Sequence, residues 1–224
     1  MAEILIETTM DFTVLFMSTA ALLLASFSSL FSVANPTAAM PIFLSLTHDY
    51  TESERKMSAK WASIYMFFIL MVFLFVGTYI LSFFGISLSG IRIAGGLIIM
   101  RIAFSMLNPD KSGRKLTVED EEEAMEKEDI SFSPIAMPML SGPGSIAVVI
   151  GFASQATGWT DYLIHTAAIL LVVLIAYLVL RLSPKIMDYM GTVGMNVMTR
   201  LMGFIALAIS VQFILSGISL YYNV

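Results

Sequence analysis

Asn35-Pro36-Thr37-Ala38-Ala39-Met40-Pro41 places two prolines inside an apolar run that is long enough to lie within a lipid bilayer. A helix that is interrupted at membrane depth exposes backbone N–H and C=O groups that lipid cannot hydrogen-bond, so protein or a water-filled cavity must supply partners. A second stretch of this kind, Ser141-Gly142-Pro143-Gly144-Ser145, lies in the second half of the chain. Two such interruptions in corresponding halves indicate a binding site between them.

The composition is that of an integral membrane protein. Of the 224 residues, 58% are hydrophobic and only 13% are charged, whereas soluble domains are about 45–50% apolar and about 25% charged. The partner that this composition predicts is the lipid bilayer. The formal net charge of −5 originates in one acidic stretch, residues 108–131, so it does not indicate a nucleic-acid partner. The absence of cysteine excludes disulfides and thiolate-bound metals.

Six apolar runs are long enough to cross about 30 Å of hydrocarbon, which needs about 20 helical residues. They are Phe12–Thr47, Trp61–Phe84, Leu88–Leu107, Phe132–Ala156, Tyr162–Leu182 and Leu201–Tyr222. We therefore predict an all-α membrane protein with six transmembrane helices. Residues 1–107 form a first three-helix half, 108–131 an acidic linker and 132–224 a second three-helix half, which together make one membrane domain.

The positions of the basic residues predict the orientation, because Lys and Arg gather in cytoplasmic loops. Ten of the twelve lie between runs one and two, three and four, or five and six: Arg55, Lys56, Lys60, Lys111, Arg114, Lys115, Lys127, Arg181, Lys185 and Arg200. Both termini are therefore predicted outside the cytoplasm, and the acidic linker inside it. The acidic N-terminus is unlike a signal peptide, so the first run is predicted to be retained as a span.

Three spans per half make the second half enter the membrane from the opposite side, which predicts an inverted repeat. Weak internal similarity supports this interpretation. Ile91-Arg92-Ile93-Ala94-Gly95 is similar to Thr199-Arg200-Leu201-Met202-Gly203, and the predicted topology puts the two arginines at opposite faces.

Both interruptions have the sequence of a helix start. Asn is a favoured N-cap and Pro a favoured first helical residue, so Asn35-Pro36 predicts a half-helix towards Thr47. Gly142-Pro143 predicts a second, antiparallel half-helix through Phe152, and the two N-termini are predicted to meet near the bilayer centre. The first run has 36 residues, or about 54 Å of helix, so it is predicted to be broken and partly re-entrant.

Helix N-termini offer unpaired N–H donors and the positive end of a dipole, which suits an anionic group. We therefore predict a site for the carboxylate of a small molecule between the two starts. Its candidate substrate-binding residues are Asn35, Pro36, Thr37, Ala38, Pro41, Pro138, Ser141, Gly142, Pro143, Gly144 and Ser145. The alternative is that Pro and Gly only kink these helices.

Five stretches together resemble the MarC family of bacterial membrane proteins. They are residues 35–47, Phe84-Gly85-Ile86-Ser87, Arg92-Ile93-Ala94-Gly95-Gly96, residues 136–145 and residues 199–203. The resemblance implies a six-span inner-membrane protein of the LysE-like exporter group. It also implies transport of small neutral amino acids such as glycine or alanine. Arg101 stands where the resemblance leads us to expect an apolar residue.

Further polar residues in the runs have two interpretations each. Arg92, Arg200 and Gln212 are possible gates or anchors, and Arg92 could also contact the carboxylate. Arg101 is expected to reach the interface. Gln212 and Ser210 could line a cavity or bond a neighbouring helix. Gly95-Gly96 is expected to allow close helix contact.

No cofactor is expected, and no metal. No run has an Asp or Glu at its middle, which disfavours proton coupling through a buried carboxylate. Sodium, held by backbone carbonyls near residues 34–36 or 139–142, is a possible coupling ion. The seventeen methionines are more typical of packing than of a metal path. His48 and His165 are predicted on opposite sides of the membrane. The sequence leaves oligomerisation open.

The predicted function is that of a secondary transporter or exporter of small neutral amino acids, and the sequence leaves the direction of transport open. An Asn-Pro half-helix is also found in aquaporin-type channels, so a channel for small solutes is the alternative. The second motif, Gly-Pro-Gly, lacks the matching Asn donor of such channels. No catalytic constellation can be placed on one side of the bilayer, so no enzyme is predicted.

Overall fold

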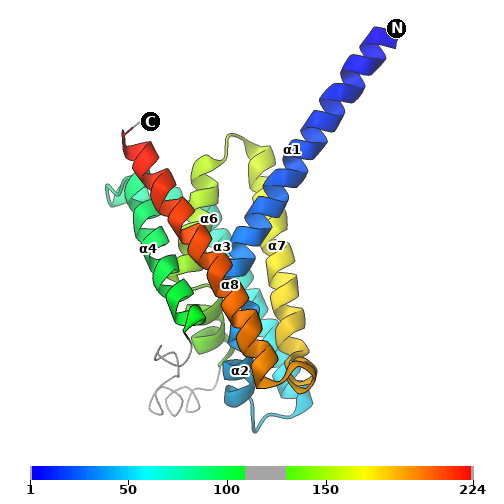
Figure 1. Cartoon of the computed structure of the whole chain (residues 1–224), viewed down its shortest axis with the longest axis vertical. Helices are drawn as coiled ribbons and strands as arrows, with labels where there is room; N and C mark the ends of the chain where they lie inside the picture. The colour runs from blue at the N-terminus through cyan, green and yellow to red at the C-terminus, as the bar shows by residue number, and fades with distance from the viewer. Residues whose placement is uncertain (1, 109–129, 223–224) are drawn as a thin grey trace.

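The chain is a bundle of helices (Figure 1). The computed structural model describes residues 2–108 and 130–222, and within these ranges it has no strand. The elements are α1 (Ala2–Ala34), α2 (Pro36–Leu46), α3 (Glu52–Phe83), α4 (Leu88–Leu107), η1 (Ser131–Leu140), α6 (Pro143–Gln155), α7 (Trp159–Arg181) and α8 (Ser183–Tyr222). The predicted acidic linker lies, apart from its ends, outside the described residues.

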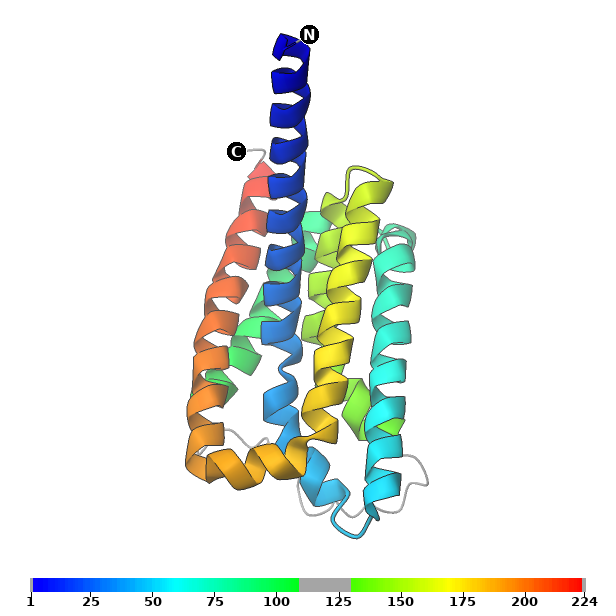
Figure 2. The same ribbon diagram turned by 90° about the vertical axis from the view of Figure 1, so that its right-hand side faces the viewer.

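The helices are long and apolar enough for five membrane spans, or for six if the bent pair η1 and α6 forms one span. The prediction of an all-helical, multi-pass membrane protein is thus confirmed. The last span begins at Val193, eight residues before the predicted Leu201. The first turns of α8 lie across one end of the bundle, and the chain turns upward at Gly191, whose φ of 61° suits glycine (Figure 2).

The connections alternate between the two ends of the bundle (Figure 2). Both chain ends, the turn at 84–87 and the turn at 156–158 lie at one end, which we call the terminal end. The loop 47–51 and the start of α8 lie at the other, which we call the basic end because Arg55, Lys56, Arg181 and Lys185 are found there. This is the alternation that the distribution of charges predicts.

The core is filled by side chains from all the membrane helices. Helix α3 packs against η1, α6 and α7, and its Met66, Leu70 and Leu74 are fully buried. At the middle of the bundle they join residues from the other helices, which are Leu30, Phe43, Ile99, Leu140, Val148 and Ile169. The exposed residues of α3, such as Phe68 and Val72, are also apolar, as a lipid-facing surface requires.

Helices α4 and α8 pack closely along their length, because glycines face the partner helix. A Cβ on Gly96 would lie 2.9 Å from the Ser210 carbonyl oxygen of α8, and one on Gly217 would lie 3.0 Å from the Ser89 carbonyl oxygen of α4. Backbones can approach this closely only where side chains are absent. The prediction that Gly95-Gly96 allows close helix contact is confirmed; a Cβ on Gly95 would meet Ala147 of α6 at 2.6 Å.

Gly96→Ala should therefore separate α4 from α8. We expect a loss of about 2 kcal/mol in the free energy of unfolding, the usual cost of overpacking, measured by thermal unfolding in detergent. Leu97→Ala is the matched control, because the neighbouring side chain is 56% exposed and surface changes usually stay within about 0.5 kcal/mol. Equal effects of the two substitutions would contradict the role of Gly96.

Candidate functional site

Asn35 separates α1 from α2 and adopts the left-handed conformation, with φ 39° and ψ 69°. Its side-chain oxygen accepts hydrogen bonds from the Ala38 N–H at 3.2 Å and from the Thr37 hydroxyl at 2.6 Å. Asn is one of the few residues that tolerate this conformation, and Pro36 takes the first helical position. The predicted helix start is confirmed.

The direction of the chain at Asn35 differs from the prediction of a partly re-entrant segment. Met17–Leu46 forms a single candidate span of 30 residues, and α2 continues in the general direction of α1 (Figure 2). Only Asn35 leaves helical geometry, and its own N–H still bonds the Phe31 carbonyl at 2.9 Å. A one-residue interruption of this kind changes the hydrogen bonding without reversing the chain.

The second interruption is larger than predicted, because η1 is not a regular α-helix. Ser133 and Met137, which precede Pro134 and Pro138, have extended backbone angles, as residues before proline prefer. The N–H of Ser141 bonds the carbonyl of Ala136, five residues back. Helix α6 then begins with Gly142 as N-cap and Pro143 as first residue, as predicted, at an angle of 61° to η1.

The two interruptions lie next to each other in the bundle core. A Cβ on Gly144 would lie 2.9 Å from Cγ1 of Val33, two residues before Asn35, and 3.2 Å from Cδ1 of Ile102. The amide of Asn35 donates to the sulfur of Met106, one turn further along α4, at 3.6 Å. The starts of α2 and α6 are therefore close together, with α4 beside both.

The polar side chains at these starts are buried. Asn35 is 4% exposed, Ser145 is 2% exposed and Ser141 is fully buried. The Ser145 hydroxyl donates to the Leu140 carbonyl at 2.9 Å. The Ser141 hydroxyl, in contrast, has no hydrogen-bond partner among the described residues. A buried hydroxyl without a partner costs about 1–3 kcal/mol, so Ser141 is the polar group here that a ligand could satisfy.

The other predicted site residues are divided between this core and the outer surface. Pro36, Gly142 and Gly144 are buried, and Thr37 and Ala38 are half-buried. Pro41, Pro138 and Pro143 are exposed. The structure thus brings together the helix starts and leaves three of the predicted prolines on the surface of the single chain.

Arg92 lies one turn inside the terminal end and joins three helices. Its Nη1 donates to the Ser216 hydroxyl of α8 at 2.8 Å, and its Nη2 donates to the Ser154 hydroxyl of α6 at 3.4 Å. Its Nε is buried without a partner among the described residues. These hydrogen bonds join α4 to α8 and to α6 near the terminal end.

The remaining polar candidates are exposed or bond within their own helix. Gln212 is exposed, because Ser210 and Ile214 turn towards Gly96 and residue 212 lies about 200° around α8 from residue 210. The Ser210 hydroxyl donates to the Leu207 carbonyl of its own helix at 2.6 Å, so this hydrogen bond does not join a neighbouring helix. Arg200 and Arg101 are exposed.

One buried polar pair escaped the sequence analysis. Ser26 Oγ of α1 and His165 Nδ1 of α7 lie 3.0 Å apart, within hydrogen-bond distance. The imidazole, 3% exposed, also stacks on Phe152 of α6 with ring centroids 4.9 Å apart. A histidine inside an apolar run was the available signal, but its partner on α1 follows only from the packing.

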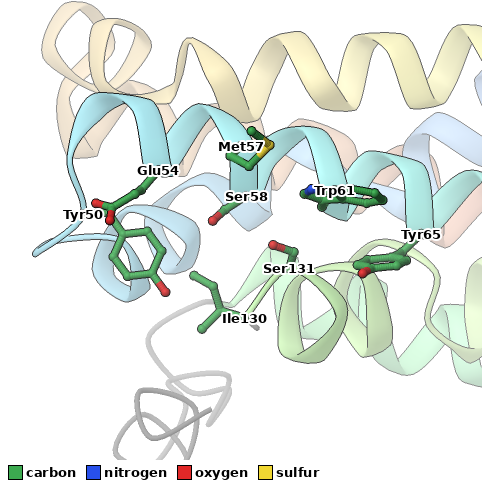
Figure 3. Close-up of a pocket in the computed structure, with 8 residues that line it drawn as sticks. All are labelled: Tyr50, Glu54, Met57, Ser58, Trp61, Tyr65, Ile130 and Ser131. Atoms are coloured by element: carbon green, nitrogen blue, oxygen red, sulfur yellow. The ribbon is translucent and has the colours of Figure 1, made fainter. Parts of the chain in front are cut away.

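A cavity of about 510 Å³ opens at the basic end, away from the helix starts (Figure 3). It is lined by Tyr50, Glu54, Met57, Ser58, Trp61, Tyr65, Ile130 and Ser131. Trp61 and Tyr65 stack on each other with centroids 5.7 Å apart. The Glu54 carboxylate already accepts from the N–H and hydroxyl of Thr51, each at 2.8 Å. None of the predicted site residues lines this cavity, whose aromatic wall is typical of a membrane interface.

Comparisons with known proteins agree over most of the chain. The model of the family described as MarC family integral membrane protein matches residues 20–222. The UPF0056 membrane protein MJ1677 of Methanocaldococcus jannaschii is 39% identical over 193 residues, which cover 86% of this chain and 94% of that protein. The UPF0056 membrane protein YvbG of Bacillus subtilis is also 39% identical, with 86% and 92% covered.

A third relative is the UPF0056 inner membrane protein MarC of Escherichia coli, which is 37% identical over 84% of this chain and 90% of its own length. No solved structure matches the chain. The match to the family extends from α1 through α8 and includes both interrupted helices and Arg92. This chain therefore belongs to the MarC family of integral membrane proteins.

Proposed function

We propose that this protein is a secondary transporter of small neutral amino acids, with the substrate carboxylate held between the starts of α2 and α6. The observation that carries the proposal is the buried Ser141 hydroxyl without a partner, beside two helix N-termini. N-termini favour negative charge, and Ser141 can donate to a carboxylate oxygen. Half-helix N-termini at mid-membrane hold substrate carboxylates in transporters of other folds.

The size of the substrate is limited by the packing at Gly144. A single added Cβ would already lie 2.9 Å from Val33 and 3.2 Å from Ile102. Ala38 on α2 and Ala147 on α6 are also small. A substrate that fits here has a small side chain, as glycine and alanine have.

The two halves support an inverted repeat by their spacing. Pro36 and Pro143, the first residues of α2 and α6, are 107 residues apart (143 − 36), and so are Glu52 and Trp159, the first residues of α3 and α7 (159 − 52). The same interval from Leu88, the start of α4, reaches residue 195, close to the start of the last span at Val193.

The packing supports the same repeat. In the repeat, α2, α3 and α4 correspond to α6, α7 and α8, and the end of α1 corresponds to η1. Each contact between two helices should then have a counterpart between the two corresponding helices. The contact of α3 with α6 corresponds to that of α7 with α2, the contact of α4 with α6 to that of α8 with α2, and the contact of α1 with α7 to that of η1 with α3. All six contacts are present, and the contacts α3 with α7 and α4 with α8 are their own counterparts. An approximate two-fold axis through the bundle accounts for this pattern, although α1 with α8 and α7 with α8 have no matching contact among the larger ones.

The orientation in the proposal follows from charge. The basic end faces the cytoplasm by the positive-inside rule, so both termini lie outside it. An inner-membrane location is supported by the name of the Escherichia coli relative. In this arrangement α2 leads from the site to the cytoplasmic end and α6 leads to the opposite end.

Transport into proteoliposomes tests the proposal. Labelled glycine and alanine are offered with imposed sodium or proton gradients and in counterflow, and we expect saturable exchange that larger neutral amino acids compete for weakly. Gly144→Leu should reduce this exchange to background, because the larger side chain would displace Val33 and Ile102 and so change the start of α6. Gly158→Leu is the matched control, since a Cβ there meets nothing closer than 3.9 Å.

Two results would contradict the proposal. Unsaturable flux of every small solute, unaffected by counterflow, would instead identify a channel. Exchange that survives Gly144→Leu would place the carboxylate elsewhere in the bundle.

A further inference from the structure

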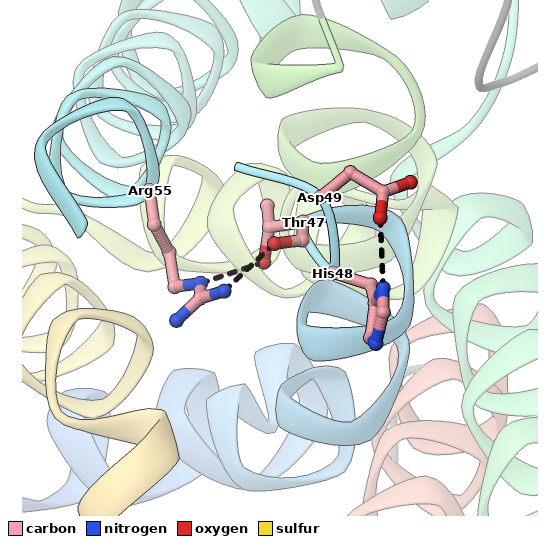
Figure 4. Close-up of polar contacts among 4 residues, drawn as sticks. All are labelled: Thr47, His48, Asp49 and Arg55. Carbon is pink, nitrogen blue, oxygen red and sulfur yellow. Dashed lines mark hydrogen bonds and ion pairs between the residues drawn. The ribbon is translucent and has the colours of Figure 1, made fainter. Parts of the chain in front are cut away.

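The outer end of α2 is held by an arginine (Figure 4). Arg55, on α3, donates from Nη2 to the Thr47 carbonyl at 2.8 Å and from Nε to the Thr47 hydroxyl at 3.2 Å. Thr47 is fully buried, and its hydroxyl also donates to the Phe43 carbonyl at 2.7 Å. The guanidinium thus fixes the C-terminal turn of α2, where carbonyls without helical partners carry partial negative charge.

The outer end of α6 is held in the same manner. Arg92, on α4, donates to the Ser154 hydroxyl in the last turn of α6. Thr47 and Ser154 are 107 residues apart (154 − 47), the interval that separates the starts of α2 and α6. Each half-helix therefore begins at the candidate site and ends at an arginine from another helix, one at the basic end and one at the terminal end.

Within residues 2–108 and 130–222, neither arginine forms an ion pair with an acidic side chain. Among the described residues the ion pairs are His48 with Asp49 and Lys56 with Glu52, so Arg55 and Arg92 bind only neutral oxygens. Figure 4 shows that the His48–Asp49 pair points away from the guanidinium of Arg55. Hydrogen bonds of this kind fix a position firmly and yet release without separating an ion pair, which suits a contact that must open and close.

We propose that Arg55 and Arg92 are the two gates of the transport cycle, Arg55 for the basic end and Arg92 for the terminal end. The inference rests on the proposed function, since it assumes that the site at Ser141 is reached from each end in turn. Access from the basic end requires α2 to move, and access from the terminal end requires α6 to move. In this structure both contacts are made and Ser141 is fully buried, which is the state closed at both ends.

The absence of cysteine from the sequence allows a direct test. Ser141→Cys introduces one thiol of nearly the same size at the buried site. Membrane vesicles of both orientations are treated with a membrane-impermeant maleimide, and the fraction labelled is measured with Arg55→Gln or Arg92→Gln added. We expect Arg55→Gln to raise labelling from the basic end about tenfold or more, and Arg92→Gln to raise labelling from the terminal end by a similar factor. A hydrogen bond to a charged group contributes about 1.5–3 kcal/mol, and 1.4 kcal/mol corresponds to a factor of ten.

Two substitutions serve as matched controls. Lys60→Gln removes an exposed charge from α3, and Arg101→Gln removes an exposed charge from α4; neither should change labelling. Arg55→Lys and Arg92→Lys keep the charge but lose the fork of donors, so they should give smaller increases from the same ends. Labelling after denaturation shows that the thiol is present and reactive in every variant.

Increased labelling from opposite ends would support the two gates. Increased labelling from the same end with both variants, or no increase while the thiol reacts normally after denaturation, would overturn them. The assay needs no cargo, so opposite-sided gating without any amino-acid exchange would contradict only the proposed substrate. Exchange together with unchanged labelling would contradict only the gates.

Discussion

Asn35→Asp should abolish amino-acid exchange in proteoliposomes at pH 8 while the protein stays folded. Asp has the shape of Asn, and one of its oxygens can accept the hydrogen bonds from the Ala38 N–H and the Thr37 hydroxyl. The substitution removes only the weak donation from the Asn35 amide to the sulfur of Met106. A negative charge at the start of α2 is favourable for the helix. It repels a substrate carboxylate at the same start, and a like-charge contact costs several kcal/mol. We expect exchange to fall about 100-fold or more, which corresponds to about 2.7 kcal/mol.

Asn35→Gly removes the Asn side chain without adding a charge, so it distinguishes the effect of a negative charge from the effect of losing the amide. Glycine adopts positive φ freely and costs only a few tenths of a kcal/mol as an N-cap compared with Asn. Exchange by this variant should stay within about tenfold of the original protein, since 1.4 kcal/mol is a factor of ten. If Asn35→Gly were as inactive as Asn35→Asp, the amide and not the absence of charge would be the feature that matters. If Asn35→Asp transported normally, the carboxylate would not bind at this start.

The helix starts could be predicted from the sequence because they depend on neighbouring residues. Asn35 as N-cap, Pro36 as first helical residue and Gly142-Pro143 with the same roles follow from local backbone geometry. The alternation of the loops was predictable for a different reason, since the membrane separates the basic residues from the rest. Both kinds of information are present in short segments of the chain.

The other features depend on residues that are distant in sequence. The path of α2 after Asn35 follows from packing against α7 and α8, and the approach of Val33 to Gly144 joins residues more than a hundred positions apart. The sequence identifies Arg55 only as a charge near a loop, whereas in the fold it binds Thr47. Gln212 was polar and within a span, but the glycine of α4 decides which side of α8 faces the bundle. Periodicity alone could not supply these contacts.

Gly142→Ala should destabilise the protein more than any other single methyl addition at the site. Gly142 has φ −66°, so alanine could adopt its backbone angles; the obstacle is space. A Cβ there would lie well inside 3.0 Å of the Pro138 carbonyl oxygen, which belongs to the backbone of η1. A backbone atom cannot move aside as a side chain can, so the junction between η1 and α6 must open. We expect a loss of about 3 kcal/mol, seen as a fall of about 6–12 °C in the unfolding midpoint in detergent.

Gly144→Ala and Gly158→Ala are the variants with which the stability of Gly142→Ala should be compared. At Gly144 the nearest atoms are the ends of the Val33 and Ile102 side chains, which can rotate away, and at Gly158 the nearest atom is 3.9 Å distant. The loss of stability should therefore decrease in the order 142, 144, 158. Gly142 contacts η1 at the start of α6, whereas Gly158 precedes α7 and has no close neighbour. The same order should therefore hold for the loss of amino-acid exchange. A variant at 142 as stable as the one at 158 would mean that the 61° bend between η1 and α6 does not depend on the close contact of Gly142 with Pro138.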